Sequence, residues 1–123
     1  MGILNHLEAK ELNKRIKEEE LKLLDMKVAL LKLEEDKKAI ELEKERVKAE
    51  ALQLIAQNKA LKNETQRKAA LMDMLNNNRW YQDLEKEEKN IESKISKTIY
   101  KIKRQQIEID FLKRELDILL SSS

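Results

Sequence analysis

The chain has 123 residues, of which 41% are charged and 3% aromatic, and it contains no Pro, no Cys and a single Gly. Its 26 basic and 24 acidic side chains nearly cancel, which leaves a net charge of +2 at pH 7. The sequence has no runs of β-branched and aromatic residues between glycine or proline turns, which excludes a β-sheet protein. Because it has no cysteine, disulfides and thiolate zinc sites are also excluded. We therefore expect an all-α protein.

Apolar side chains recur at alternating spacings of three and four residues from Ala9 to Leu61, which is the coiled-coil spacing. Seam 1, as we name this series, consists of Ala9, Leu12, Ile16, Glu19, Leu23, Met26, Leu30, Leu33, Lys37, Ile40, Lys44, Val47, Ala51, Leu54, Asn58 and Leu61. The spacing predicts a helix over residues 8–61. Lys37 and Lys44 occupy consecutive seam positions, where a polar residue weakens packing but can fix register or partner number.

A second series with the same spacing begins at Tyr81. Seam 2 consists of Tyr81, Leu84, Glu88, Ile91, Ile95, Thr98, Ile102, Gln105, Ile109, Leu112, Leu116 and Leu119. It predicts a helix over residues 78–120.

Between the seams, the sequence predicts a short helical elbow over residues 64–75. Asn63 is a good N-cap, and Gln66 three residues later can close a capping box. Asn76 to Asn78 form a stop signal, because Asn tolerates the left-handed conformation and caps the next helix. Whether the break near Lys62 is a turn or a kink stays open. We expect one elongated domain over residues 1–123, an antiparallel coiled-coil hairpin of two long helices joined by this elbow.

Several apolar residues fall off the seams and would stay in water in a single hairpin. The residues we expect at a subunit contact are Leu21, Leu24, Val28, Leu31, Ile107, Phe111 and Ile118. A helix that is apolar on several sides is usually covered on several sides, and small extended folds bury little of their surface. The pattern predicts a homodimer or larger homo-oligomer.

The sequence indicates no catalytic, metal or cofactor site. Its one histidine, His6, lies near the start, no glycine-rich phosphate loop is present, and the clustered carboxylates lie among lysines on helices. No apolar run approaches the ~18 residues of a membrane span, and Met1 to Ala9 do not resemble a signal peptide. We expect a non-enzymatic protein of the cytoplasm that has no membrane partner.

One basic cluster stands out between Ser93 and Ile107, a stretch without acidic residues. It consists of Lys94, Lys97, Lys101, Lys103 and Arg104. A basic stripe on one helix face is typical of phosphate contacts in nucleic-acid binding. Alternatively these cations pair with acidic residues of the first helix (Glu34, Glu35, Asp36, Glu41, Glu43 and Glu45), as seam-flanking residues do in coiled coils. We favour the ion pairs.

A second candidate site is Arg79-Trp80-Tyr81, beside Arg67 and Lys68. Exposed aromatic residues next to arginine suit base stacking, and Trp and Arg are also frequent hot spots of protein interfaces. The alternative is that Trp80 packs the elbow onto the long helices.

The stretch KNETQRKA at residues 62–69, followed by WYQDL at 80–84 and a Glu/Lys/Ile-rich helix, resembles small helical proteins encoded in bacteriophage gene clusters for DNA metabolism and recombination. The resemblance implies an accessory protein near DNA replication, recombination or inhibition of host functions, in the host cytoplasm. It carries over no functional residue. Three hypotheses follow: an oligomeric adaptor or inhibitor with a protein partner, a scaffold without nucleic-acid contact, and a direct DNA-binding protein.

Overall fold

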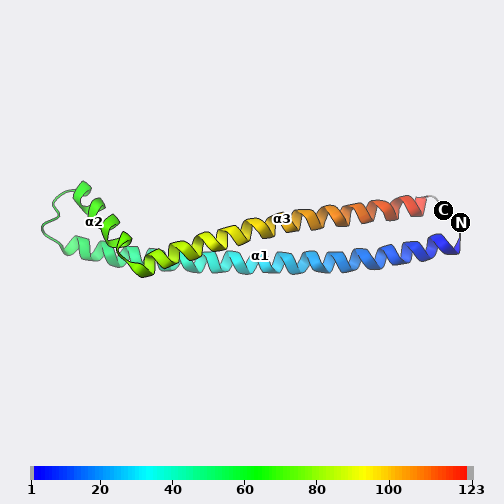
Figure 1. Ribbon diagram of the computed structural model, residues 1–123, viewed down its shortest axis with the longest axis horizontal. Coiled ribbons are helices and arrows are strands. Elements are labelled where there is room, and N and C mark those ends of the chain that lie inside the picture. The colour runs from blue at the N-terminus through cyan, green and yellow to red at the C-terminus, as the bar shows by residue number, and fades with distance from the viewer. Residues whose placement is uncertain (1, 122–123) are drawn as a thin grey trace. The chain divides into compact units, whose positions relative to one another are not determined.

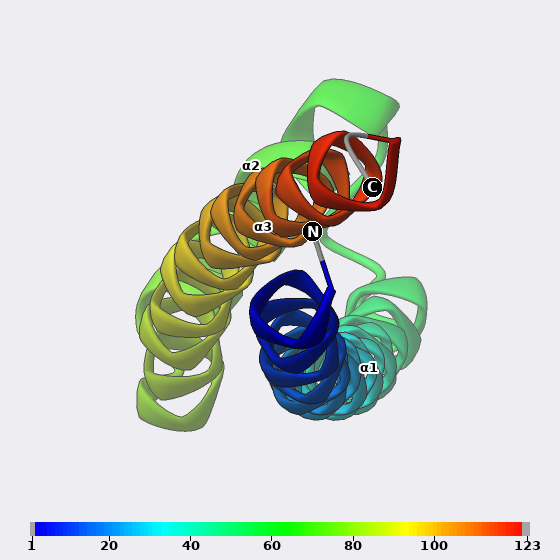
Figure 2. The ribbon, with the colours of Figure 1, turned by 90° about the vertical axis from the view of Figure 1, so that its right-hand side faces the viewer.

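A computed structural model describes residues 2–121, and the part of the chain it describes is helical without any strand. Its three helices are α1 (Ile3–Gln57), α2 (Glu64–Asn76) and α3 (Arg79–Ser121) (Figure 1). The all-α expectation is confirmed. The chain divides into two compact units: unit 1 contains Met1–Lys32 and Ile95–Ser123, and unit 2 contains Leu33–Lys94. In unit 1, the first part of α1 and the last part of α3 lie side by side (Figure 2).

The bounds of the first helix differ from the predicted range 8–61. The helix begins at Ile3 and ends at Gln57, and Asn58 accounts for the early end. Its side-chain Oδ1 accepts from the Ala60 backbone N–H at 3.0 Å, and its carbonyl accepts from Leu61 at 3.2 Å. Because an Asn side chain competes with helical hydrogen bonds in this way, residues 58–63 form a turn, which settles the choice between turn and kink.

The N-cap predicted for α2 is confirmed. Asn63 has an extended backbone (φ −134°, ψ 168°), and its Oδ1 accepts from the Gln66 backbone N–H at 2.8 Å. The reciprocal bond of the capping box is displaced by one residue, since Gln66 Oε1 accepts from Lys62 N–H at 2.9 Å. The bond to Asn63 gives a partner to the Gln66 amide, one of the free amides at the start of the helix.

The stop after α2 is right-handed, so the predicted left-handed residue is wrong. Asn77 has φ −92° and ψ −4°, and no described residue other than glycine has a positive φ. Because α3 starts two residues later, a tight right-handed turn suffices, with Asn77 N–H donating to Asp73 O at 3.0 Å. The second role predicted for this segment is confirmed, since Asn78 Oδ1 caps α3 by accepting from Tyr81 N–H at 2.9 Å.

The core of unit 1 is made by seam residues from both long helices. Ile16 and Leu23 of α1 are buried, and Ile109 and Leu112 of α3 are each only 1% exposed. The polar seam residues meet one another: Gln105 Nε2 donates to Glu19 Oε2 at 2.6 Å and to the Glu19 carbonyl at 2.9 Å. Both seams therefore mark buried or half-buried positions in this unit.

In unit 2 the core is centred on Val47, Tyr81 and Leu84, with Ile40 and Leu75 packed against it. Two seam positions predicted from the sequence are wrong: Asn58 is exposed beyond the end of α1, and Leu54 is 58% exposed while Ile55 is buried at 4%. A straight helix drifts by ~20° per heptad from a strict 3.5-residue repeat. A four-residue step from Ala51 to Ile55 compensates for that drift and keeps an apolar side chain facing inward.

Candidate interaction surfaces

An apolar stripe lies open on α1 in unit 1. We call Leu21, Leu24, Val28 and Leu31 stripe 1; their exposed fractions are 63%, 56%, 57% and 60%. Their spacing of three, four and three residues places them along one face of the helix, away from seam 1. Large contiguous apolar patches are typical of interaction sites, so stripe 1 is a candidate for one.

α3 carries a corresponding stripe in the same unit. We call Ile107, Phe111 and Ile118 stripe 2; they are 67%, 56% and 65% exposed. Arg114 lies between the last two at helical spacing. The structure thus leaves uncovered all seven residues for which the sequence predicted a subunit contact.

A groove adjoins stripe 1 in unit 1. Its lining includes Lys17, Leu21, Leu24 and Lys27 of α1 and Gln106 and Lys113 of α3. The buried seam residues Leu23 and Ile109 also reach it. A helix lying in the groove would therefore touch both long helices over an apolar base, with three lysines and Glu20 at the rim.

The basic cluster is exposed on α3, with Lys97, Lys101, Lys103 and Arg104 in unit 1 and Lys94 in unit 2. Among the described residues, the four cations of unit 1 make no ion pair within 4 Å. Two of the acidic residues predicted as their partners pair within unit 2. Glu41 pairs with Lys37 instead, and Glu43 with Arg46.

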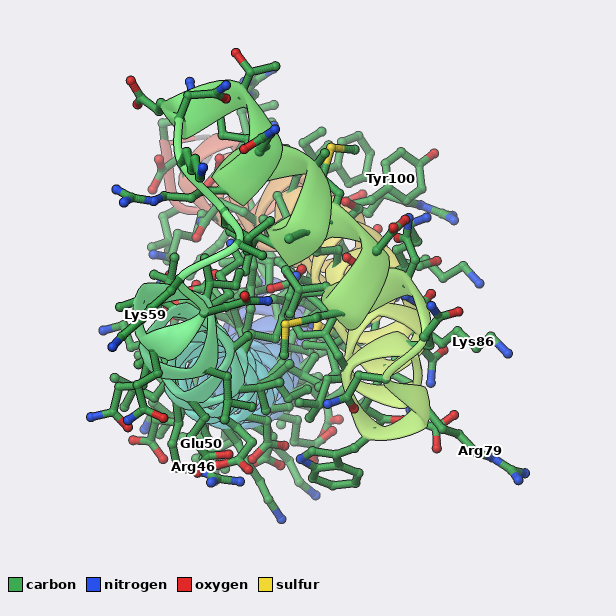
Figure 3. The ribbon with its side chains drawn as sticks, turned by 90° about the vertical axis from the view of Figure 1, so that its left-hand side faces the viewer. Arg46, Glu50, Lys59, Arg79, Lys86 and Tyr100 are labelled. Carbon is green, nitrogen blue, oxygen red and sulfur yellow. The ribbon has the colours of Figure 1, made fainter. Side chains whose placement is uncertain are left out.

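Tyr100 belongs to this basic surface, although the sequence interpretation missed it. Its ring is 63% exposed, and the Arg104 guanidinium carbon lies 5.9 Å from the ring centroid. Figure 3 shows the ring projecting away from the helices. The signal was its position three residues after Lys97 and four before Arg104, on one helix face.

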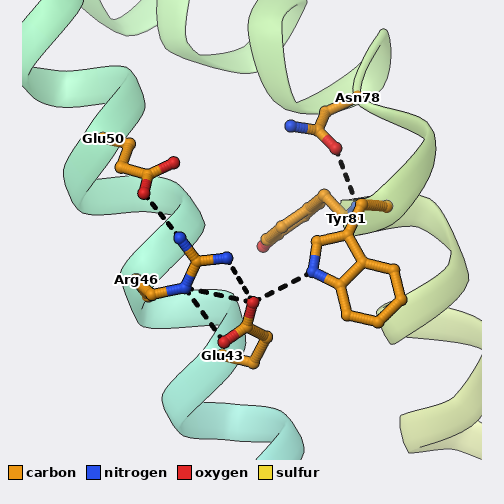
Figure 4. Close-up of polar contacts among 6 residues, drawn as sticks. Glu43, Arg46, Glu50, Asn78 and Tyr81 are labelled. Atoms are coloured by element: carbon orange, nitrogen blue, oxygen red, sulfur yellow. Dashed lines mark hydrogen bonds and ion pairs between the residues drawn. The ribbon is translucent and has the colours of Figure 1, made fainter.

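Trp80 is hydrogen-bonded to α1 in unit 2, although it is 52% exposed. Its indole Nε1–H donates to Glu43 Oε1 at 3.0 Å, and the same carboxylate binds Arg46, which also binds Glu50 (Figure 4). Arg79 projects into solvent (Figure 3). This hydrogen bond joins the start of α3 to α1, whereas the predicted alternative was that Trp80 packs the elbow onto the long helices. Arg67 is exposed on α2, where Lys68 pairs with Glu64 at 3.7 Å.

Hydrogen bonds favour the ionised forms of Glu43, Lys44 and Arg46 in unit 2. Hydrogen bonds from Arg46 and then Trp80 lower the pKa of Glu43 to about 2, and Glu43 raises the pKa of Arg46. Burial acts to lower the pKa of Lys44, but its hydrogen bond to Glu88, 3.0 Å away, and nearby negative charge raise it on balance. Lys44 also lies 5.3 Å from the Tyr81 ring centroid. These groups link α1 to α3 at neutral pH.

Among residues 2–121 there is no group of three acidic, His or Cys side chains placed to hold a metal ion. The described helices include no stretch apolar and long enough to cross a bilayer. The sequence matches no protein-family model, and the searches found no significant similarity to a curated protein or to a solved structure.

Proposed function

We propose that this chain is a non-enzymatic coiled-coil interaction protein that self-associates through the open apolar stripes of unit 1. The observation that carries the proposal is the exposure of stripe 1, which is spaced like a coiled-coil seam, and of stripe 2, whose spacing is completed by Arg114. Water contact with seven large apolar side chains on two helices of one unit is unfavourable, and association would remove it.

The proposal includes an antiparallel hairpin of α1 and α3. In unit 1, Arg15 pairs with Glu108 and Glu19 with Gln105. In unit 2, Lys37 pairs with Glu92 and Lys44 with Glu88. In each unit the partner's number on α3 falls as the number on α1 rises, which supports opposite helix directions.

Sedimentation of the chain between about 1 and 100 µM tests self-association. We expect a mass above that of the monomer, 14.6 kDa, and dissociation when Leu24 and Leu31 are both changed to Glu, because a buried unpaired charge is strongly disfavoured. Leu54→Glu is a matched control, since Leu54 is equally exposed but lies in unit 2. A wild-type monomer throughout this range would refute the proposal.

The resemblance to phage helical proteins suggests DNA replication and recombination, in the cytoplasm, as the process in which a protein partner acts. Co-purification from cells carrying the gene, followed by reconstitution with each purified candidate, tests this part. If every candidate fails to bind in reconstitution, a purely structural scaffold becomes the better interpretation.

A second candidate function is nucleic-acid binding by Lys97, Lys101, Lys103 and Arg104. Their exposure and the absence of ion pairs among the described residues favour it, and Tyr100 offers a ring on which a base can stack. If four phosphates are neutralised on a single strand, log K should fall with log salt with a slope of about −3.

Fluorescence anisotropy with a labelled single-stranded oligonucleotide measures that slope. Changing Lys97, Lys101 and Arg104 to Glu should abolish binding and leave helicity intact. Changing Lys10, Lys14 and Lys38 to Glu alters the net charge equally at other exposed positions and should weaken binding much less. No binding by the wild type at low salt would exclude this function and leave the adaptor or scaffold.

A further inference from the structure

The two apolar stripes of unit 1 face in different directions. At 100° per residue, stripe 2 lies about 150° around α3 from seam 2, so it faces away from the helix against which seam 2 packs. The groove beside stripe 1, in contrast, is lined by both helices. A chain therefore presents a groove in one direction and a ridge in another.

Stripe 2, which forms the ridge, and stripe 1, which borders the groove, have similar lengths. Stripe 1 runs from Leu21 to Leu31 and spans about 15 Å, and stripe 2 runs from Ile107 to Ile118 and spans about 17 Å. Stripe 1 follows the spacing of three and four residues that allows helices to interdigitate, and stripe 2 follows it with Arg114 at one position. The apolar face of the last part of α3 is therefore of a size that suits a third helix lying in the groove.

Their charges are complementary as well. Lys17, Lys27 and Lys113 line the groove, with Glu20 as the one acidic lining residue. Four acidic and two basic residues lie between 107 and 118. Lys113 pairs with Glu20 at 3.9 Å. Among the described residues, Glu115, Asp117, Lys17 and Lys27 make no ion pair within 4 Å, and neither does Arg114 within stripe 2. Unpaired acids beside stripe 2 can thus approach unpaired lysines beside stripe 1.

We infer that stripe 2 of one copy of this chain docks into the groove beside stripe 1 of a second copy. This inference rests on the proposed self-association and specifies its geometry. The contact is heterologous, because it joins two different surfaces. Each pair of copies then retains one unused groove and one unused ridge, and further copies can add.

Mixing two variants tests the inference. Leu24→Glu places a charge in the groove and leaves stripe 2 intact, while Phe111→Glu places a charge on stripe 2 and leaves the groove intact. Both positions are 56% exposed, so we expect each variant to fold, as its circular dichroism and melting temperature would show. We expect each variant alone to sediment as a monomer. An equimolar mixture should form a one-to-one complex that grows no further, because the remaining groove and ridge both carry the charge.

The other outcomes separate this inference from the proposed function. If the wild type associates and either variant alone still forms a dimer, like surfaces pair with like, and the heterologous contact is wrong while self-association stands. The same holds if the wild type associates but the mixture stays monomeric. A monomeric wild type refutes both. Leu54→Glu serves again as the control and should assemble like the wild type.

Discussion

Replacing Lys44 by Met should lower the free energy of unfolding by about 1–3 kcal/mol, because Glu88 would keep its charge in the seam without a cation. The Lys44 Nζ and Glu88 Oε1 atoms are 3.0 Å apart, and the two side chains retain 17% and 19% of their exposure. At an effective dielectric constant of about 20, such charges attract by roughly 5 kcal/mol. Partial desolvation of both groups offsets much of this. The remainder should lie between the ~0.2–1 kcal/mol of an exposed pair and the ~3–5 kcal/mol lost on breaking a buried one.

Urea denaturation of a double-mutant cycle, with Lys44→Met, Glu88→Gln and the combined variant, isolates this pair from the contact of Lys44 with the Tyr81 ring. We expect a coupling energy of about 1 kcal/mol or more. Lys68→Met is the matched control, because Lys68 and Glu64 are 3.7 Å apart but 75% and 84% exposed, and it should cost less than ~0.5 kcal/mol. If Lys44→Met costs no more than this control, the seam pair is not desolvated and the reasoning fails.

Three further outcomes are expected. The fluorescence of Trp80, the only tryptophan, should titrate with Glu43 near pH 2, since the pKa of Glu43 is lowered to about 2. Stability from this network should be complete above about pH 4.5 and lost as the pH falls toward 2, and Glu43→Gln should remove both effects. Asn63→Ala should cost about 0.5–2 kcal/mol, seen as weaker amide-exchange protection at the start of α2; unchanged protection would contradict the cap. Ile109→Ala should cost about 2–5 kcal/mol in denaturant, and Ile107→Ala in the monomer far less, because their exposures are 1% and 67%; equal losses would contradict the core.

The seams could be predicted because helical periodicity depends only on which side chains avoid water. Even Glu19 was correctly assigned to the seam, because the assignment used its spacing from the apolar residues and not its polarity. Leu54 was misplaced because the series was continued with a strict 3.5-residue repeat. Such a repeat cannot indicate where a straight helix needs a four-residue step in place of a three-residue one. Asn58 was counted as a seam residue, although its side chain ends the helix.

The candidate surfaces were harder to predict than the fold. The pairing of basic residues depends on which carboxylates come within reach, and spacing along one helix contains no information about distances to another. Trp80 illustrates this limit, since its partner Glu43 lies 37 residues earlier in the chain. Exposure of stripe 1 and stripe 2 was inferable, because each side chain lies off a seam.

The polar pairs in the seams also bear on how the helical segments within each unit could slip past one another. In the observed register Lys44 faces Glu88 in unit 2, and Glu19 faces Gln105 in unit 1. A shift of one heptad in one direction would place Ile95 opposite Lys44 and Leu112 opposite Glu19, so that two charges would lose their partners to hydrocarbon. The opposite shift would bring Tyr81 and Thr98 to the same places, and an aromatic ring or a hydroxyl can still accommodate a charge. If the helical segments slipped by one heptad, we therefore expect the direction that brings in Tyr81 and Thr98 to cost less free energy than the other.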